Sequence, residues 1–468
     1  MRITPYGIIV LTGLWGWGFL AGESITISGA QESYAGRSIE VTIAGNPFLE
    51  KPIFSETIVC DDRGAFRTEI ETGEGTIIRF ASGIYEATLF AEPGKQYEVH
   101  LPAYRELAYP ERISPFYEPV KVPMKVVGNP RDVNHDIFRF DSLFMPVNEQ
   151  LLLRRRSGQD PRADSMIMAL NTHFTSGSSS WFDDYRRYRA GILQLNAGRT
   201  GLESISLEYL GPHVREHHPA FMELFGAMFK DFLVFYGHTS GGNGIRHQIN
   251  RAHNLDSLRA IINGHPAVFS DTLGDLILLQ ELPTLFYRGD FHKEAILILL
   301  DSMESDPINP AYALYASQLR KNLSSLMTGN PPPSFTLTGT DGAAYSPVDF
   351  EGKYTFLMFC TPDQYGCMME YPFLDSYVSK HSDYLEVVTI MVAEQETLVK
   401  GFMERNHHTW KALYYQEKME MLDNYRVRAF PVAYLIGPDG KLILSPAPLP
   451  SDGFEQQLFQ IMRSRGDI

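Results

Sequence analysis

The apolar run from Tyr354 to Phe359 is the feature of this sequence that most constrains its fold. A strand that is apolar at nearly every position is buried on both faces, as the central strands of parallel sheets are. Such a sheet needs helices on both sides to cover it. The segments Leu385 to Val392 and Val432 to Ile436 have the same character. We therefore predict an α/β domain in the C-terminal part of the chain.

The segments around these strands complete the pattern. Helices are expected over Glu370 to Ser379, Thr397 to Arg405 and Phe454 to Arg463. The turn Gly437-Pro438-Asp439-Gly440 joins the third strand to a fourth at Leu442 to Leu444, because Gly and Pro are the strongest local turn signals. The predicted order is strand, helix, strand, helix, hairpin and helix.

The first part of the chain has the period of two that strands require. Ile39, Val41 and Ile43 alternate with polar residues, and several similar segments follow, separated by Gly, Pro and Asp. Short alternating strands with such turns are typical of an antiparallel β-sandwich. We predict this β-sandwich over residues 23–125. Cys60 falls in it and is interpreted as a buried, inert thiol.

The middle of the chain has helical spacing instead. Phe221, Leu224, Phe225 and Met228 show the spacing of one buried helix face. Residues 126–328 are therefore predicted to form an all-α domain whose function the sequence does not reveal. The proline run that ends at Pro333 favours an extended linker, so the last domain is placed at residues 334–468.

Length and charge limit the possible functions. The chain has 468 residues, which predicts several domains, and a formal net charge of -15. This acidic balance argues against nucleic acid as a partner, because a phosphate-binding surface needs clustered Lys and Arg.

Residues 1–22 have the pattern of a secretory signal peptide. Arg2 supplies a positive start, Ile8 to Leu20 is mostly apolar, and Ala21 and Gly22 offer small residues near a cleavage point. An uncleaved membrane anchor is the alternative. We expect an exported protein of the periplasm or cell envelope, where disulfides persist. The chain has three cysteines, too few for a disulfide-stapled scaffold.

The segment after the first buried strand carries a redox-site motif. Cys367 is preceded by Gln364 and followed by Glu370 and Pro372. This pattern resembles the active site of thioredoxin-fold proteins of the TlpA/ResA type, which are related to AhpC/TSA proteins. In that family an apolar strand leads into Cys-x-x-Cys, and Glu and Pro follow at fixed offsets. The resemblance places Cys367 on the second Cys and Gln364 on the first, attacking one.

Other segments carry the same resemblance. Pro333 to Leu337 resembles the opening of the family's domain, and Phe350 to Lys353 precedes the central strand as a Gly-Lys pair does there. Tyr425 to Pro431 resembles the segment with the cis-proline, which implies that role for Pro431. The resemblance further implies a substrate-binding edge formed by Pro431, Phe430 and Gln364, which Phe430 narrows because Thr or Val is usual there. The first domain weakly resembles the prealbumin-like β domains of some envelope proteins.

The resemblance implies thiol–disulfide exchange with thiols or disulfides of exported proteins, without a cofactor. A dithiol cycle needs a low-pKa thiolate at the attacking position, and the amide of Gln364 cannot supply one. Cys367 is the candidate catalytic residue, alone or with Cys360, which lies at the end of the central strand. A displaced Cys360–Cys367 disulfide requires Cα atoms within about 7 Å. The alternative interpretations are a core residue for Cys360 and a buried leftover thiol for Cys367.

Two further functions remain open. The domain can be an inactive thioredoxin-fold module that binds proteins, or a peroxiredoxin-like one-Cys peroxidase that uses Cys367, with Gln364 in place of the usual Thr. No metal site is predicted. His213, His217 and His218 come close to metal-ligand spacing, but no carboxylate or Cys completes a known set.

Overall fold

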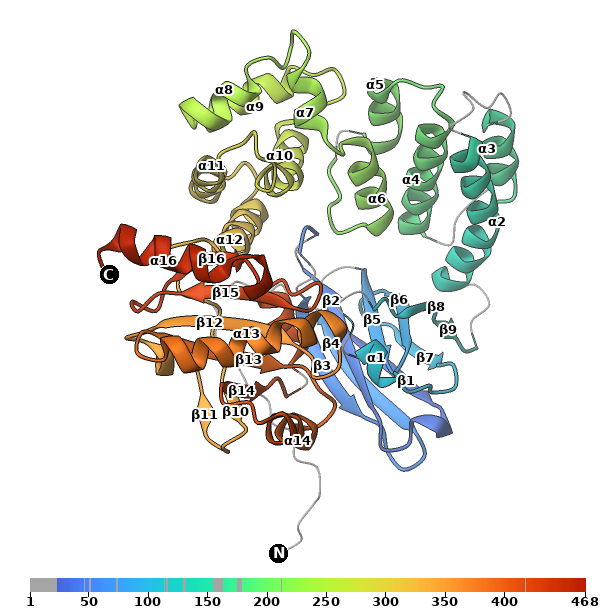
Figure 1. Ribbon diagram of the computed structural model, residues 1–468. Helices are drawn as coiled ribbons and strands as arrows, with labels where there is room; N and C mark the ends of the chain where they lie inside the picture. Colours follow the sequence, from blue (N-terminus) through green and yellow to red (C-terminus); the bar gives the residue numbers. More distant parts are fainter. Residues whose placement is uncertain are drawn as a thin grey trace, which may run out of the picture.

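The computed structural model describes residues 23–468, apart from residues 46, 50–51, 73–74, 113, 115–116, 129–131, 155–162, 175–178, 212 and 417. The predicted export signal, residues 1–22, lies outside the described residues. Figure 1 shows three parts that follow one another along the chain: a pair of β-sheets, an array of helices, and a mixed sheet flanked by helices. Within the described ranges, no helix combines the length and the apolar character that a bilayer span requires.

The first part consists of two sheets that share one hydrophobic core. Its elements are β1 (Glu23–Ala30), η1 (Glu32–Tyr34), β2 (Ser38–Ala44), β3 (Pro52–Val59), β4 (Ala65–Thr72), β5 (Thr76–Ser82), β6 (Tyr85–Ala91), β7 (Gln96–His100), β8 (Val120–Pro123) and β9 (Lys125–Val126). The sheet orders are β4-β1-β7-β9 and β3-β2-β5-β6-β8. In β2, Ile39, Val41 and Ile43 are buried in the shared core, because alternate side chains of a strand point to the same face.

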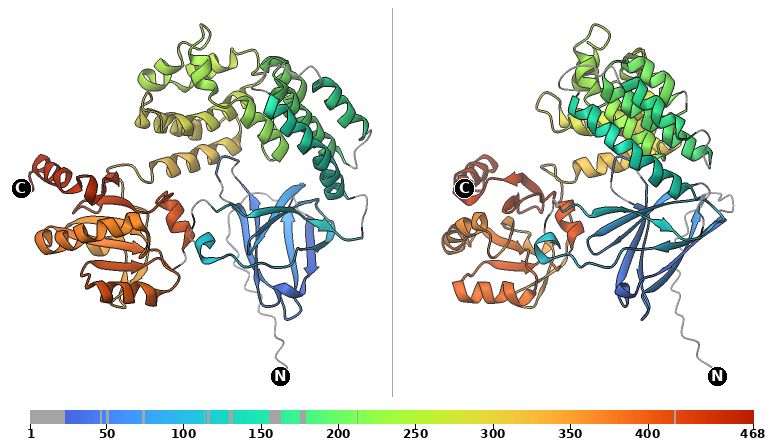
Figure 2. Two further views of the ribbon diagram at one scale, coloured as in Figure 1. Left: turned by 45° about the vertical axis from the view of Figure 1, so that its right-hand side comes forward. Right: turned by 90° about the vertical axis from the view of Figure 1, so that its right-hand side faces the viewer.

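A long connection, residues 101–119, joins β7 to β8, and its first residues stay on the β-sheet core, where Leu101 is buried and the Arg105 carbonyl accepts from the Ile84 N–H at 3.0 Å. The connection also carries the short helix α1 (Tyr109–Arg112). It ends at β8, which pairs in parallel with β6. In Figure 1 and in both views of Figure 2, α1 lies on the side of the β-sheets that faces the C-terminal part.

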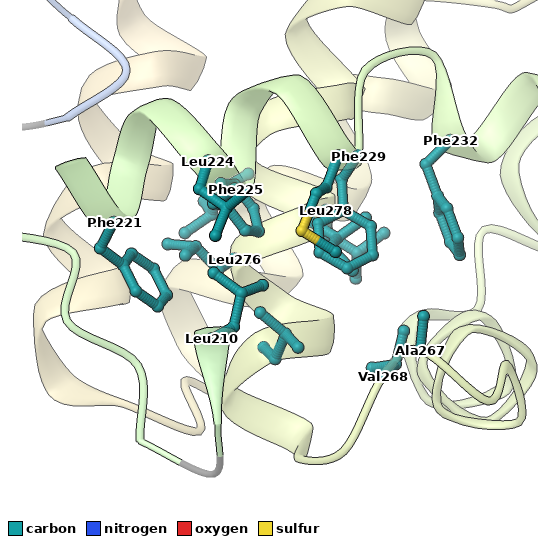
Figure 3. Close-up of a cluster of buried hydrophobic side chains, with 14 of the residues drawn as sticks. Leu210, Phe221, Leu224, Phe225, Phe229, Phe232, Ala267, Val268, Leu276 and Leu278 are labelled. Carbon is teal, nitrogen blue, oxygen red and sulfur yellow. The ribbon is translucent and has the colours of Figure 1, made fainter. Parts of the chain in front are cut away.

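The middle part is helical, as the spacing predicts. Its elements are α2 (Val133–Arg154), α3 (Ala163–Thr172), α4 (Ser180–Ala197), α5 (Leu202–Ile205), η3 (Ser206–Leu210), α6 (Pro219–Met228), α7 (Phe232–Gly237), α8 (Ile245–His247), η4 (Gln248–Ala252), α9 (Leu255–Asn263), α10 (Asp271–Leu285), α11 (Lys293–Ser305) and α12 (Pro310–Ser324). Figure 3 shows Phe221, Leu224 and Phe225 of α6 beside Leu276 and Leu278 of α10, and all five side chains are buried. The apolar stripe of α6 thus faces the centre of the helical core.

Aromatic contacts join the β-sheets to the helices. Phe90 of β6 stacks on Trp181 of α4 with ring centroids 4.0 Å apart. Phe48, between β2 and β3, packs edge-on against Tyr315 of α12. Contacts at two separate places fix the orientation of the sheets relative to the helices.

Backbone hydrogen bonds join the helices to the C-terminal part. The Gly329 N–H donates to the carbonyl of Leu442 at 2.8 Å, and the Leu442 N–H donates to the carbonyl of Asn330 at 2.8 Å. The guanidinium of Arg426 donates to the carbonyl of Asn322, near the end of α12, at 2.6 Å. The residues before the proline run are therefore bonded to the last sheet.

The C-terminal part is a seven-stranded mixed sheet with helices on both faces. Its elements are β10 (Leu337–Gly339), β11 (Ala344–Tyr345), η5 (Pro347–Phe350), β12 (Tyr354–Cys360), α13 (Tyr365–His381), β13 (Leu385–Met391), α14 (Glu396–Asn406), β14 (Lys411–Tyr414), α15 (Met419–Asn424), β15 (Val432–Ile436), β16 (Leu442–Ala447), η6 (Pro450–Asp452) and α16 (Phe454–Arg465). The strand order is β11-β10-β14-β13-β12-β15-β16. Helices α13, α14 and α16 pack on one face, and α15 packs on the other.

Strand β12 has the central, two-sided burial that its sequence predicts. All seven of its residues are buried, and it pairs in parallel with β13 and antiparallel with β15. The α/β prediction for this part is confirmed. The helix expected from Glu370 begins earlier, at Tyr365, so that it starts directly after the polar loop that follows β12.

A buried ion pair in the helical part offers a test of its core. Arg259 of α9 donates twice to the carboxylate of Asp275 of α10, from Nε and Nη2, at 2.8 Å each. We expect Arg259→Met to lower the free energy of unfolding by about 3 kcal/mol or more at pH 7, because it leaves a buried carboxylate unpaired. Burial already raises the pKa of Asp275, so the loss should shrink as the pH falls and this carboxyl takes up a proton. Denaturant unfolding of the parent protein and of Arg259→Met at pH 5 and pH 7 measures this loss of unfolding free energy.

The matched control is Arg199→Met. Arg199 pairs with Asp164 at 3.1 Å, and both side chains are largely exposed. An exposed pair contributes less than about 1 kcal/mol. Similar losses for the two variants would contradict the central role of the buried pair.

Candidate functional site

The candidate site lies where β12 ends and α13 begins. Cys360 is the last residue of β12, and Cys367 lies in the first turn of α13. The loop from Thr361 to Gln364 connects them. The site thus stands at the carboxyl end of a central strand, where ligand sites of open α/β sheets commonly lie.

Cys367 is enclosed by this loop. Its side chain is completely buried, the Thr361 N–H donates to its sulfur at 3.4 Å, and its own thiol donates to Gln364 Oε1 at 3.9 Å. Burial raises the pKa of the Cys367 thiol to about 11, and the hydrogen bond from Thr361 offsets only part of that rise. At pH 7 only about one thiol in ten thousand is then ionised. In this arrangement Cys367 is a neutral, protected thiol.

Cys360 is also sealed in the core. Its thiol donates to the sulfur of Met391 in the adjacent strand at 3.1 Å. Burial raises the pKa of Cys360 well above its ordinary value, and the nearby Cys367 raises it further. All three cysteines are free thiols, and Cys60, one residue beyond β3, is buried as well. A Cys360–Cys367 disulfide stays a hypothesis about another redox state.

Gln364 occupies the exposed N-cap position of α13. Its backbone N–H donates to Thr361 Oγ1 at 3.2 Å, and its side chain does not cap the helix. A side chain at this position is close to the positive end of the helix dipole, which favours a negative charge. The position therefore suits an ionised thiol, but an amide occupies it.

The proline segment lies beside the start of α13. The Phe430–Pro431 peptide bond is cis, as the resemblance implies. A Cβ atom added to Gly366 would lie 3.2 Å from Pro431 Cδ and 3.7 Å from the Phe430 carbonyl oxygen. Gly366 thus permits the close approach that brings Cys367 and Pro431 to one site. Phe430 is half-buried and packs against the cores on both faces of the sheet.

Glu370 and Pro372 shape helix α13 and its packing, and no hydrogen bond in the described part of the chain joins either residue to a cysteine. Both carboxylate oxygens of Glu370 accept hydrogen bonds from Ser451 of η6, from Oγ at 2.6 Å and from the backbone N–H at 2.9 Å. Pro372 lies inside α13, where it cannot donate to the carbonyl of Met368. The glutamate therefore ties α13 to the segment that leads into α16.

Tyr371 is a site residue that the sequence analysis did not identify. Its hydroxyl donates to the carbonyl of Thr361, and its ring stacks on Trp410 with centroids 5.6 Å apart. It therefore fixes the inner end of the loop that covers Cys367. The sequence signal that could have identified Tyr371 is its spacing, because a residue four positions after Cys367 lies on the same face of a helix.

The described residues contain no cluster of three or more His, Cys, Asp or Glu side chains that could hold a metal ion. His218 is instead stacked on Trp181 at 4.4 Å, and burial lowers its pKa to about 4. A cavity of about 330 Å³ lies at the opposite end of the C-terminal sheet from Cys367, lined by Glu386, Trp410 and Lys411 among others. It has no contact with the Cys367 loop.

Comparisons with known proteins agree with this geometry. Residues 328–445 match the AhpC/TSA family. The thiol-disulfide oxidoreductase ResA of Bacillus subtilis (strain 168) is 30% identical over 124 residues, which are 25% of this chain and 66% of ResA, so the chain spans just under two thirds of that relative. ResA of Bacillus cereus (strain ATCC 10987 / NRS 248) is 26% identical over 137 residues, 28% of this chain and 76% of ResA.

A solved structure, the thioredoxin domain of a thiol-disulfide oxidoreductase from Bacteroides vulgatus, is 24% identical; the match covers 29% of this chain and 98% of that domain, with a TM-score of 0.27. Strand order, the Cys367 loop, the cis Phe430–Pro431 bond and the sequence matches all lead to one assignment. Through its C-terminal domain the chain is similar to the TlpA/ResA-like family of thioredoxin-fold proteins.

Proposed function

We propose that this protein takes part in thiol–disulfide exchange with exported proteins and that Cys367 is its only redox-active residue. The observation that carries the proposal is the position of Cys367, in the first turn of α13 beside the cis Phe430–Pro431 bond. The relatives that match are thiol-disulfide oxidoreductases, which supports protein thiols or disulfides as substrates. The attacking position of a dithiol site is then held by Gln364.

The exchange step runs through a mixed disulfide. The Cys367 thiolate attacks one sulfur of a client disulfide, the client S–S bond breaks, and the other client sulfur leaves as a thiolate. A second thiol, from the client or a small-molecule thiol, then attacks the mixed disulfide and releases Cys367. Because Gln364 cannot resolve the intermediate, we expect this protein to form long-lived mixed disulfides rather than to turn over rapidly.

Client recognition is assigned to the surface formed by Gln364, Phe430 and Pro431. Gln364 is exposed, and Phe430 and Pro431 are half-buried beside it. An extended client segment can lie along this edge with its sulfur directed toward Cys367. We include in the proposal an envelope location, which the predicted export signal supports, and a prealbumin-like β-sandwich for the two N-terminal sheets.

A binding module without chemistry is the second candidate function. The complete burial of Cys367 and its pKa of about 11 favour it, because the thiol is neither ionised nor accessible in this conformation. In that case the same surface would hold clients without bond exchange. A one-Cys peroxidase is less favoured, because Gln364 does not offer the hydroxyl that such a site places near its thiolate.

The first test restores the attacking position. Gln364→Cys should create a dithiol site that reduces a model protein disulfide such as insulin about tenfold or more faster than the parent, because a helix N-terminus lowers a thiol pKa toward about 7. The gain should vanish in Gln364→Cys combined with Cys367→Ser.

The control uses a second helix in the same domain. Gln395 is the exposed N-cap residue of α14, and no Cys follows it three residues later. Gln395→Cys should therefore give no gain. Equal rates for the two cysteine variants would contradict the assignment of Gln364 to the attacking position.

The second test follows the ionisation of Cys367. Its folded-state pKa of about 11 lies above the ordinary value of about 8.5. The protonated thiol thus favours the closed fold, and this contribution is lost as the pH rises from about 8.5 through 11. We expect the rate of Cys367 alkylation in the native protein to rise about tenfold per pH unit from pH 7 to 10 without levelling.

Peptide mass spectrometry after timed alkylation measures this rate. The urea-unfolded protein is the control, in which the same peptide should level off near pH 8.5 to 9. A plateau at or below pH 8.5 in the native protein would show an ordinary, accessible thiol and would contradict the sealed site.

A further inference from the structure

The connection between β7 and β8 contacts the C-terminal domain near the Thr361–Gln364 loop. Residues 101–119 run between β7 and β8, and their helix α1 lies against the C-terminal domain (Figure 1). Arg112 Nη2 of α1 lies 3.4 Å from Glu394 Oε1. These two residues are 282 positions apart in the sequence. The contact therefore joins the first domain to the last without passing through the helical part.

Glu394 belongs to the loop next to the one that covers Cys367. It follows β13, the strand that pairs in parallel with β12. The two strand ends are bonded directly, because the Val392 N–H donates to the carbonyl of Cys360 at 2.8 Å. The Glu394 carbonyl also accepts from the hydroxyl of Tyr414 at 3.2 Å. Arg112 thus contacts a loop whose position is coupled to the end of β12.

Tyr109 of α1 lies within electrostatic range of the Thr361–Gln364 loop. Burial raises the pKa of its hydroxyl, and Tyr415 and the Asp363 carboxylate raise it further. Asp363 is part of the loop from Thr361 to Gln364. The Arg112 guanidinium lies 6.0 Å from the centre of the Tyr109 ring, so the two α1 side chains form one unit. This unit contacts the C-terminal domain through Glu394.

The Glu394 loop, which α1 contacts, lies beside the loop that covers the thiol, because Val392 is hydrogen-bonded to Cys360 and Thr361 directly follows Cys360. Thr361 and Gln364, at the two ends of the covering loop, both contact the Cys367 sulfur. A client or reagent reaches that sulfur only if the loop moves. We propose that α1 is an intramolecular brace: through Glu394 and the hydrogen bond from Val392 to Cys360 it holds the neighbouring Thr361–Gln364 loop closed over Cys367, and release of α1 from Glu394 exposes the thiol. This inference rests on the proposed role of Cys367 in thiol exchange.

The contact between α1 and Glu394 is weak enough to break without unfolding the protein. The Arg112 and Glu394 side chains are 34% and 45% exposed, and an ion pair of this kind contributes little in water. The C-terminal domain keeps its own joint to the helices through Arg426 and Asn322. Loss of the α1 contact therefore need not separate the domains. A client that binds beside Gln364 and moves the Thr361–Gln364 loop works against the α1 contact with the neighbouring Glu394 loop, which couples client binding to exposure of the thiol.

Charge reversal in the full-length protein tests the brace. Arg112→Glu should raise the native-state alkylation rate of Cys367 about two- to fivefold, as loss of a weak exposed contact predicts. Glu394→Arg, a second variant in the other domain, should have the same effect. Combining Arg112→Glu with Glu394→Arg should return the rate to that of the parent. Cys60, in the core of the β-sheets, reports general unfolding, and its rate should not change.

Arg105→Glu is the matched control, since Arg105 is an exposed residue of the same segment. Unchanged Cys367 rates in both single variants, or equal rises for Arg105→Glu and Arg112→Glu, would overturn the brace. Failure of the proposed function looks different: the single variants would accelerate Cys367 alkylation, yet Cys367→Ser would leave the capture of client thiols and disulfides unchanged.

Discussion

The two-sided burial of β12 is the constraint on which the rest of this structure depends. Every residue of the strand is buried, so helices must cover both faces, and the chain leaves the sheet at Cys360. The polar loop that follows has to turn over the end of the strand before α13 begins. The position of Cys367 in the first turn of α13 is a consequence of this path. The two neighbouring strands, β13 and β15, bring the Glu394 loop and the Phe430–Pro431 bond to the same edge.

The parts of the fold that are set by burial could be predicted from the sequence. The apolar runs of β12, β13 and β15 and the apolar stripe of α6 have periods that local geometry dictates. The start of α13 could not be predicted in this way, because its first turn lacks such a period. Tyr365, Met368 and Met369 are 76%, 52% and 52% exposed, so the first turn of this helix shows no periodic apolar face. Cys367, Gln364 and Pro431, which the motif singled out, lie close together in the structure, and their roles stay a prediction.

The burial and the ionisation of the Cys367 thiol could not be predicted from the motif. The loop that covers Cys367 is held by the hydroxyl of Tyr371, which donates to the carbonyl of Thr361. The contact of Arg112 with Glu394 joins residues from opposite ends of the chain, and no local pattern encodes such a pairing. The same motif with an open loop would leave a reactive thiol. In the proposed brace, the reactivity of Cys367 depends on the packing of two domains as well as on the spacing of the cysteines.

If Cys367 is the one redox-active thiol, as proposed, burial beneath a closed loop has a physical benefit. In a dithiol site, a partner cysteine resolves every mixed disulfide, so accidental capture is quickly reversed. Cys367 has Gln364 where that partner would lie, and an exposed low-pKa thiol in its place would stay blocked by the first disulfide it met. A neutral thiol with a pKa of about 11 beneath a closed loop avoids this trap. It then needs a signal that opens the loop only when a client is bound, and α1, which contacts the neighbouring Glu394 loop, is placed to provide it.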